Sequence, residues 1–218
     1  PNGAGKTTCF NVITGLYQPD SGHFALNGIA YSPSAPHLVA RAGIARTFQN
    51  LRLFGAMTAL ENVMVGRHVR TRQGVLGAVL RHSAARSEEQ AIRQQAQDLL
   101  ELVGIGNLAQ RTARSLSYGD QRRVEIARAL ATDPLLLALD EPAAGMNATE
   151  KASLSDLLQR IRAMGTTILL IEHDVKMVMR LCDQVTVLDY GKVIADGSAD
   201  EVQRHPEVIA AYLGREAA

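Results

Sequence analysis

The chain opens on residues whose types and spacing could hold the phosphates of a nucleotide. Pro1 to Thr7 read Pro-Asn-Gly-Ala-Gly-Lys-Thr, which matches all but the first position of the pattern Gly-x-x-x-x-Gly-Lys-Ser/Thr. In this pattern backbone N–H groups surround phosphate oxygens, the lysine reaches the β- and γ-phosphates, and the hydroxyl binds Mg²⁺. A helix that starts at the loop adds its positive end. The residues expected to bind nucleotide are Asn2, Gly3, Ala4, Gly5, Lys6, Thr7 and Thr8, with Thr7 also a ligand of Mg²⁺.

The opening glycine of this pattern would stand one position before Pro1. We therefore expect the natural protein to continue upstream of Pro1. A phosphate-binding loop follows a buried strand, and this strand would also lie upstream. Without it we expect an apolar gap in the sheet and a poorly stable chain, because unfilled apolar volume lowers the free energy of unfolding.

A second group of candidate residues follows an apolar segment. Leu135 to Leu139 contains only apolar residues and ends in Asp140-Glu141. Open α/β sheets bind ligands at the carboxyl ends of their strands. Asp140 at that edge suits indirect binding of Mg²⁺ beside Thr7, and Glu141 suits polarising a water for attack on a γ-phosphate. The alternative, two acidic residues in an ordinary surface loop, fits less well beside a phosphate-binding loop.

A third motif, Leu116-Ser117-Tyr118-Gly119-Asp120, leads into a predicted helix. Together with the first two motifs, it resembles the signature Leu-Ser-Gly-Gly-Gln of the ATP-binding subunits of ABC transporters. Tyr118 replaces the first glycine and Asp120 replaces the glutamine. In this family two subunits enclose two ATP molecules, so the resemblance implies that Ser117 and Gly119 contact the γ-phosphate held by a second subunit. Taken alone, Ser117 would be read as a helix cap.

The resemblance assigns roles to two more residues. It implies that Gln49 senses the γ-phosphate and Mg²⁺ and contacts membrane subunits, and that His173 bridges the γ-phosphate and Glu141. Taken alone, a histidine after a strand would be read as structural. Asn147 stands where the family has an aspartate in a loop that contacts the second subunit. The predicted catalytic residues are Glu141, His173 and Gln49, and the predicted ligands of Mg²⁺ are Thr7, Gln49 and Asp140.

The resemblance is closer to one branch of the family, the high-affinity branched-chain amino acid importers, and it spans essentially the whole chain. It rests on residues 46–50, 141–147, 188–192 and 206–214. It implies an ATPase that powers solute import at the cytoplasmic face of the membrane as a peripheral subunit. The implied partners are a second ATP-binding subunit (a copy or a paralogue), transmembrane permease subunits and, indirectly, a solute-binding protein. No nucleic-acid partner is expected.

Composition agrees with a packed globular domain. The 218 residues include 23 basic and 22 acidic ones, so net charge gives no reason to invoke nucleic acid or an anionic membrane. No apolar run reaches the roughly 20 residues that span a bilayer. The predicted fold is α/β: a phosphate-loop NTPase core with a mostly parallel sheet, an antiparallel β segment and an inserted α-helical subdomain. We expect one domain over 1–218, with the helical subdomain at 72–132.

Amphipathic and apolar patterns place the elements along the chain. Strands are expected at 23–26, 44–48, 135–139, 167–171 and 184–188, and a loop-rich insertion at 71–86. Helices are expected from 6 to about 15, at 58–70, 87–103, 119–131, around 154–161, at 175–182, and as two short helices after Ser198.

Other functions remain open. A soluble ABC ATPase acting on ribosomes or DNA fits less well, because such proteins carry two cassettes or a long coiled coil, and this chain has one cassette and no sustained heptad pattern. A non-hydrolysing subunit would be expected to lack Lys6, Glu141 or His173. An importer of another solute stays possible, because the ATPase never contacts the solute. Candidates for a groove that receives a permease helix, with core packing as the alternative, are Leu51, Leu53, Phe54 and Met57.

Overall fold

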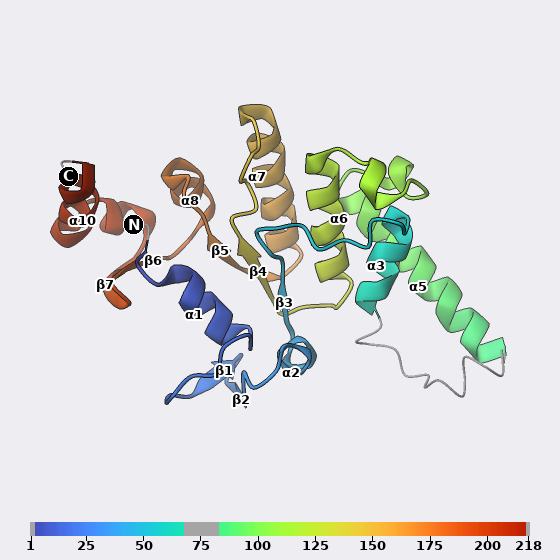
Figure 1. Ribbon diagram of the computed structural model, residues 1–218, viewed down its shortest axis with the longest axis horizontal. Helices are drawn as coiled ribbons and strands as arrows, with labels where there is room; N and C mark the ends of the chain where they lie inside the picture. The colour runs from blue at the N-terminus through green and yellow to red at the C-terminus, as the bar shows by residue number, and fades with distance from the viewer. Residues whose placement is uncertain (1–2, 68–82, 217–218) are drawn as a thin grey trace.

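The computed structural model describes residues 3–67 and 83–216 (Figure 1). Asn2 and residues 72–82 of the predicted helical subdomain lie outside these ranges. Three parallel strands, β3 (Ile44–Arg46), β4 (Leu136–Asp140) and β5 (Thr167–Ile171), form the central sheet in the order β3-β4-β5. Because the strands are parallel, the residues that follow each of them meet at one edge of the sheet.

Side chains of β4 fill both faces of this sheet. Leu137 and Leu139 have no exposed surface and join the main core, which includes side chains of α6 (Tyr118–Leu130) and α7 (Ala148–Ala163). Ala138 points to the other face and packs with Phe10 of α1 (Lys6–Ile13). An unbroken apolar segment such as β4 is typical of a parallel strand covered on both sides.

Helices α3 (Ala59–Arg67), α5 (Ser83–Leu102) and α6 pack together at one end of the molecule, opposite β6, β7 and α10 (Figure 1). Thr58 and Glu61 cap α3 as their spacing predicts, with Thr58 N 2.7 Å from Glu61 Oε2 and Glu61 N 3.1 Å from Thr58 Oγ1. Each of the three helices contributes fully buried side chains to this contact, among them Val63, Leu100 and Ile126.

Two antiparallel hairpins and several short helices complete the fold. The hairpins are β1 (Phe24–Leu26) with β2 (Ile29–Tyr31), and β6 (Val185–Asp189) with β7 (Lys192–Gly197). Each turns on two residues with positive φ, Asn27-Gly28 and Tyr190-Gly191. The remaining helices are α2 (Pro36–Ala42), α8 (Val175–Leu181), α9 (Ala199–Gln203) and α10 (Pro206–Glu216), with 3₁₀ turns η2 (Gly106–Leu108) and η3 (Ala113–Ser115).

The sequence patterns located most elements but missed some. The helix expected from Ser87 begins at Ser83, so the described end of the expected 71–86 loop is helical. Residues 83–86 contain no glycine or proline that would stop a helix. Strands β2 and β7 and helix α2 were not predicted. These elements are short, and their apolar residues do not mark a buried face, since Ile29 and Val193 are 72% and 59% exposed.

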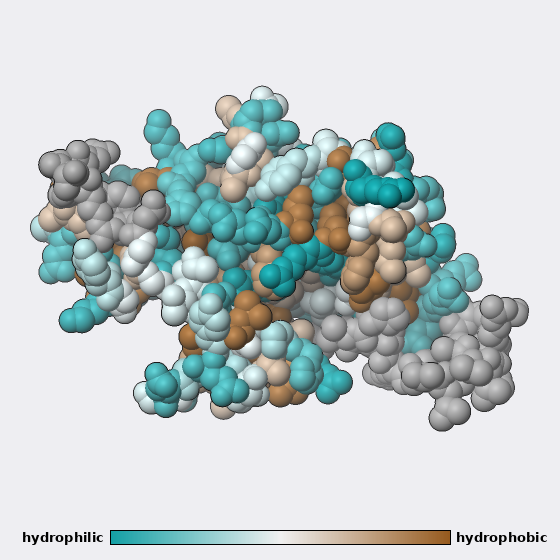
Figure 2. Space-filling view, viewed as in Figure 1, coloured by the Kyte–Doolittle hydropathy of each residue, from teal (hydrophilic) through white to brown (hydrophobic). Residues whose placement is uncertain are grey.

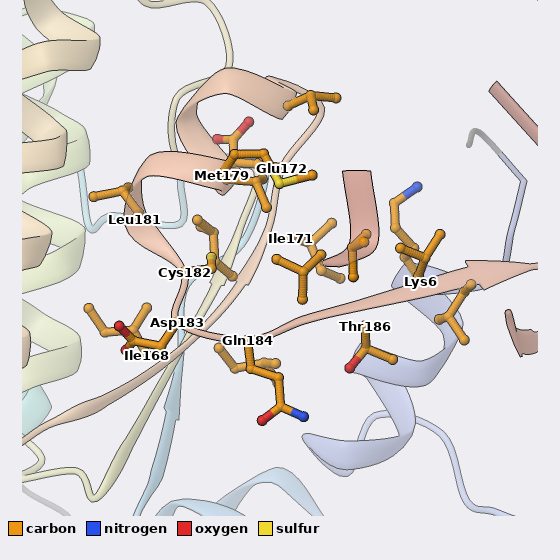
Figure 3. Close-up of a pocket in the computed structure, with 18 of the residues that line it drawn as sticks. Lys6, Ile168, Ile171, Glu172, Met179, Leu181, Cys182, Asp183, Gln184 and Thr186 are labelled. Atoms are coloured by element: carbon orange, nitrogen blue, oxygen red, sulfur yellow. The ribbon is translucent and has the colours of Figure 1, made fainter. Parts of the chain in front are cut away.

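A cleft of about 1410 Å³ separates β5 from β6 (Figure 3). Apolar side chains of both strands and of α1 and α8 line most of it, among them Ile171 and Met179, while Lys6, Glu172 and His173 also reach it. Along the described chain, β5 pairs with β4 on one edge and with no strand on the other. The cleft therefore lies along the edge of β5 that faces away from β4.

The surface is mainly hydrophilic in the view of Figure 2, with apolar residues gathered in separate patches. Within residues 3–67 and 83–216, no helix has both the length and the hydropathy that a membrane span requires.

Candidate active site

Residues 3–5 form a tight loop that leads directly into α1, whose first residues are Lys6 and Thr7. Gly3 and Gly5 have φ of +74° and +94°, in the left-handed region that favours glycine. A Cβ on Gly5 would also lie 3.3 Å from Cα of Gly191, and the Ala4 carbonyl accepts a 2.9 Å hydrogen bond from Gly191 N. Within the described chain no side chain caps α1, so its first N–H groups can meet an anion.

Arg46, at the end of β3, joins the phosphate-loop helix to the central sheet. Its guanidinium donates to Asn11 Oδ1 and Thr14 Oγ1 of the α1 region, each at 2.7 Å, and pairs with Asp140 Oδ2 at 2.9 Å. The rings of Phe10 and Phe48 lie 4.7 and 5.0 Å from the guanidinium carbon. Burial lowers the pKa of Arg46, and the neighbouring Asp140 opposes that shift. Arg46 therefore holds α1 and Asp140 in a fixed relation.

Our sequence reasoning assigned no chemical role to Arg46. The available signal was a charged residue at the end of an otherwise apolar strand segment, since a buried charge requires a partner. The sequence alone does not identify the partner, Asp140, which lies 94 positions away.

Glu141 lies between the other two predicted catalytic residues. Its Oε2 accepts a 2.8 Å hydrogen bond from Gln49 Nε2, and its Oε1 lies 2.6 Å from His173 Nε2. Gln49 follows β3, Glu141 follows β4 and His173 follows β5, so the parallel sheet brings the three side chains together. The Glu141 side chain is 15% exposed and His173 is 50% exposed, so the carboxylate is shielded and the imidazole faces outward.

The backbone around Glu141 is held in an uncommon conformation. Glu141 has φ of +46°, a region that few residues other than glycine adopt. Its N–H donates to Ile171 O at 2.9 Å, and Glu172 Oε1 accepts from Ala143 N at 2.8 Å. These two bonds tie the segment after β4 to the end of β5. Sites where surrounding contacts maintain such strain are frequently functional. Glu172 is a supporting residue that the sequence did not reveal.

Ser117 and Gly119 lie apart from this group, at the start of α6. The Ser117 hydroxyl donates to Asp120 Oδ2 at 2.7 Å and accepts from Asp120 N at 3.2 Å, so it caps the helix. Both residues border a small cavity of about 130 Å³ that Met146 and Glu150 also line. The contacts of Ser117 are therefore local to its own helix turn, whereas those of Glu141 join three strands.

The three departures from the family pattern each make a local contact. Asp120 completes the cap of α6 with Ser117. The Tyr118 hydroxyl accepts from Arg122 at 3.1 Å. Asn147 caps α7 in a reciprocal arrangement with Glu150, whose N–H lies 3.0 Å from Asn147 Oδ1.

The residues predicted to hold Mg²⁺ have suitable chemistry. Thr7 supplies an exposed hydroxyl at the loop, and Gln49 retains its Oε1 because its Nε2 is bonded to Glu141. Asp140 is 5% exposed and paired with Arg46, which suits a contact through water. No cluster of three His, Cys, Asp or Glu side chains that could hold a metal occurs within the described ranges, so phosphate oxygens would complete the coordination, as is usual for Mg²⁺.

Comparison with known proteins agrees with this geometry. The sequence profile of the family described as ABC transporter matches residues 1–144, and that of the branched-chain amino acid ATP-binding cassette transporter matches residues 192–218. The high-affinity branched-chain amino acid transport ATP-binding protein BraF of Pseudomonas aeruginosa is 45% identical over 215 residues, which is 98% of this chain and 84% of that protein. LivG of Escherichia coli, which carries the same description, is 43% identical with the same coverage.

Solved structures give the same result. The ADP conformation of an ATP-binding cassette of an ABC transporter superposes with a TM-score of 0.82 at 32% identity, covering 98% of this chain and 85% of that chain. A parallel sheet whose strand ends carry acidic residues beside a phosphate-binding loop defines a nucleoside triphosphatase core. The chain belongs to the ABC transporter family, as an ATP-binding cassette with ATPase activity. The predicted fold class is confirmed.

Proposed function

We propose that this cassette hydrolyses ATP to power the import of branched-chain or related amino acids through separate membrane subunits. Two relatives at 43–45% identity are amino acid transport proteins of this kind, and the C-terminal residues match the same group. A relative of 32% identity from Haemophilus influenzae belongs to a lipopolysaccharide export system. The support for the solute therefore comes from the higher identity and the C-terminal match, and not from the cassette fold.

The position of Glu141 between Gln49 and His173 carries the proposed mechanism of hydrolysis. A carboxylate bonded on both sides keeps one orientation, in which it can accept a proton from the water that attacks the γ-phosphate. His173 is exposed enough to contact the γ-phosphate while it retains its contact with Glu141. Gln49 would respond to the γ-phosphate and Mg²⁺, because its Nε2 is bonded to Glu141 and its Oε1 would be available to hold the metal.

The phosphate loop supplies the nucleotide contacts. The backbone N–H groups of residues 3–8 would surround the phosphates, and Lys6 would neutralise charge on the β- and γ-phosphates. Thr7, Gln49 and Asp140 would hold Mg²⁺, which when bound orients the γ-phosphate and neutralises its charge. Arg46 bonds both α1 and Asp140, so it fixes the position of Asp140 relative to the helix that carries Thr7.

Ser117 and Gly119 are proposed to complete the site of a second cassette, an identical copy or a paralogue. They lie at the start of α6, a helix of 13 residues whose N-terminal end favours an anion. The hydrogen bonds described for the Ser117 hydroxyl are confined to the first turn of that helix. A γ-phosphate presented by the partner would meet the hydroxyl, the N–H groups and the helix end together.

The proposed membrane partners would dock close to Gln49, which places the protein as a peripheral subunit on the cytoplasmic face. Phe54 is 50% exposed and Met57 is 38% exposed, whereas Leu53 packs against the core. Two of the four predicted groove residues thus present apolar surface that a permease helix could cover. A solute-binding protein would act on the other side of the membrane.

The test is a reconstituted transporter. The natural full-length protein is purified with its membrane subunits and solute-binding protein, and ATP hydrolysis is measured with leucine, isoleucine or valine and with unrelated solutes. Branched-chain amino acids should stimulate hydrolysis, and a complex carrying Glu141→Gln should assemble without being stimulated. Stimulation by lipopolysaccharide or by nucleic acid, with none by amino acids, would reject the proposal.

A further inference from the structure

A fully buried arginine holds the backbone of Gln49. Arg122 of α6 has no exposed side-chain surface, and its guanidinium donates to Phe48 O at 2.6 Å and to Gln49 O at 2.7 Å. These carbonyls belong to the two peptide groups on either side of the Gln49 Cα. A second arginine of the same helix, Arg128, donates to Arg52 O. Helix α6 therefore holds the 48–52 segment at both ends.

The burial of Arg122 is balanced by charge. Its Nη1 donates to Glu125 Oε2 at 2.7 Å, and Glu125 has only 1% of its side chain exposed. Burial raises the pKa of Glu125, and the charges of Arg122 and Arg128 act against that rise. Tyr118 covers the pair from the first turn of α6, with its ring 5.8 Å from the guanidinium carbon.

Arginine is suited to this arrangement. Its planar guanidinium presents several N–H donors in a fixed geometry, so one side chain can bind two carbonyls, a carboxylate and a hydroxyl at once. A lysine at this position would keep the positive charge but would lack the planar set of N–H donors that binds both carbonyls. Ser117 caps the same helix five residues before Arg122, so a displacement of α6 would carry both residues.

We propose that Arg122 is a positioning residue for ATP hydrolysis. It fixes the Gln49 backbone so that the Gln49 amide can contact Glu141. Because Arg122 belongs to α6, it also couples that contact to the helix that Ser117 caps. The inference rests on the proposed function of Gln49 and Ser117. A movement of α6 when a second cassette engages Ser117 would shift the carbonyls of Phe48 and Gln49, and with them the Gln49 amide.

The test is a double-mutant cycle on ATP hydrolysis in the natural full-length protein with its membrane subunits. Arg122→Lys keeps a charge opposite Glu125 and should lower kcat about 10- to 100-fold, the usual loss when a supporting residue behind a site is changed. KM for ATP should stay unchanged, because the phosphate loop is untouched. The matched control is Arg123→Lys, since Arg123 lies on the same helix but bonds Val103 O and Ser153 Oγ. It should retain wild-type kcat.

Gln49→Ala alone should also lower kcat, and Arg122→Lys added to it should lower kcat no further, because Arg122 acts through Gln49. Losses that multiply in the double variant would overturn the inference and leave the role of Gln49 standing. A normal kcat in Gln49→Ala would overturn both. A normal kcat in Arg122→Lys would overturn the inference alone.

A second variant covers the possibility that Arg122→Lys does not fold. Arg122→Gln combined with Glu125→Gln removes both charges of the buried pair, while Arg128 keeps its bond to Arg52 O, yet the new amide cannot reach both carbonyls. This double variant should show the same loss of kcat and the same absence of a further loss with Gln49→Ala. Multiplying losses in this background would count against the inference in the same way.

Discussion

Glu141 and Ser117 are held in different ways, although both are proposed to act on a γ-phosphate. Glu141, which follows β4, is bonded to Gln49 at 2.8 Å and to His173 at 2.6 Å. These two residues follow β3 and β5, the strands on either side of β4. Ser117 is bonded only to Asp120 among the contacts described for its hydroxyl, three positions along the same helix. The first residue depends on the whole sheet for its place, and the second on one helical turn.

This difference indicates which half of the chemistry the chain can assemble by itself. The sheet positions a carboxylate, an amide and an imidazole without help from another molecule. The start of α6 presents a hydroxyl and N–H groups with no described partner from another part of the chain beyond its own cap, which is the arrangement expected of a surface that serves a second subunit.

The largest effect is expected from Glu141→Gln. The amide keeps the shape and the hydrogen bond to His173 or Gln49 but cannot accept a proton, so hydrolysis should fall by roughly 10² to 10⁴. ATP binding should persist, and the protein should accumulate as an ATP-bound dimer. The measurements are the steady-state ATPase rate and the mass of the complex with ATP. Near-normal hydrolysis would remove Glu141 from its proposed role.

Ser117→Arg tests the other side of the comparison. A bulky cation at the start of α6 should obstruct the second subunit, and loss of a transition-state contact of this kind costs about 10² to 10³ in rate. The affinity of the isolated monomer for ATP should not change, as measured by titration with a fluorescent nucleotide. Loss of monomer binding would mean that Ser117 serves the site of its own chain.

Lys6→Ala should weaken ATP binding itself. The lysine makes a charge-assisted contact with phosphate, worth about 1.5 to 3 kcal/mol, so the Kd for ATP should rise about 10- to 100-fold. Calorimetric titration measures this directly. An unchanged Kd would contradict the assignment of the phosphate loop.

Mixing the Lys6→Ala and Ser117→Arg proteins sharpens the comparison further. A heterodimer of the two has one site with both defects and one site with neither, so part of the activity should return if one intact site suffices. If Ser117 acted in its own chain, each site would carry one defect and no activity would return.

The smallest effect is expected at Asn147, which departs from the family aspartate. Its side chain caps α7, so Asn147→Ala should lower the free energy of unfolding by about 1 kcal/mol, whereas Asn147→Asp should be close to neutral. Chemical denaturation of the two variants measures the difference. Equal stability of both would show that the cap contributes little and that Asn147 is retained for another reason.

Local signals in the sequence located most of the fold. The apolar segments at 135–139 and 167–171 became β4 and β5 within one residue. Reciprocal caps form at Thr58/Glu61 and Ser198/Glu201, whose three-residue spacing is typical of a capping box. These features depend on residues a few positions apart, which periodicity and capping rules describe. Helix α2 and strand β7 were not predicted, because they are short and their residues are partly exposed.

The sequence by itself indicated the phosphate-loop pattern and most of the helices and strands, and its resemblance to the ABC family implied the grouping of Gln49, Glu141 and His173. In the structure these three residues meet because each follows a strand of the same parallel sheet. Only the tertiary structure decided that Arg46 pairs with Asp140 and that Arg122 binds the carbonyls around Gln49, across 94 and 74 positions of sequence. A charged residue in an apolar segment indicates that a partner is needed. Which residue becomes that partner depends on how helices and strands pack, and no local sequence pattern encodes contacts between residues so far apart in the chain.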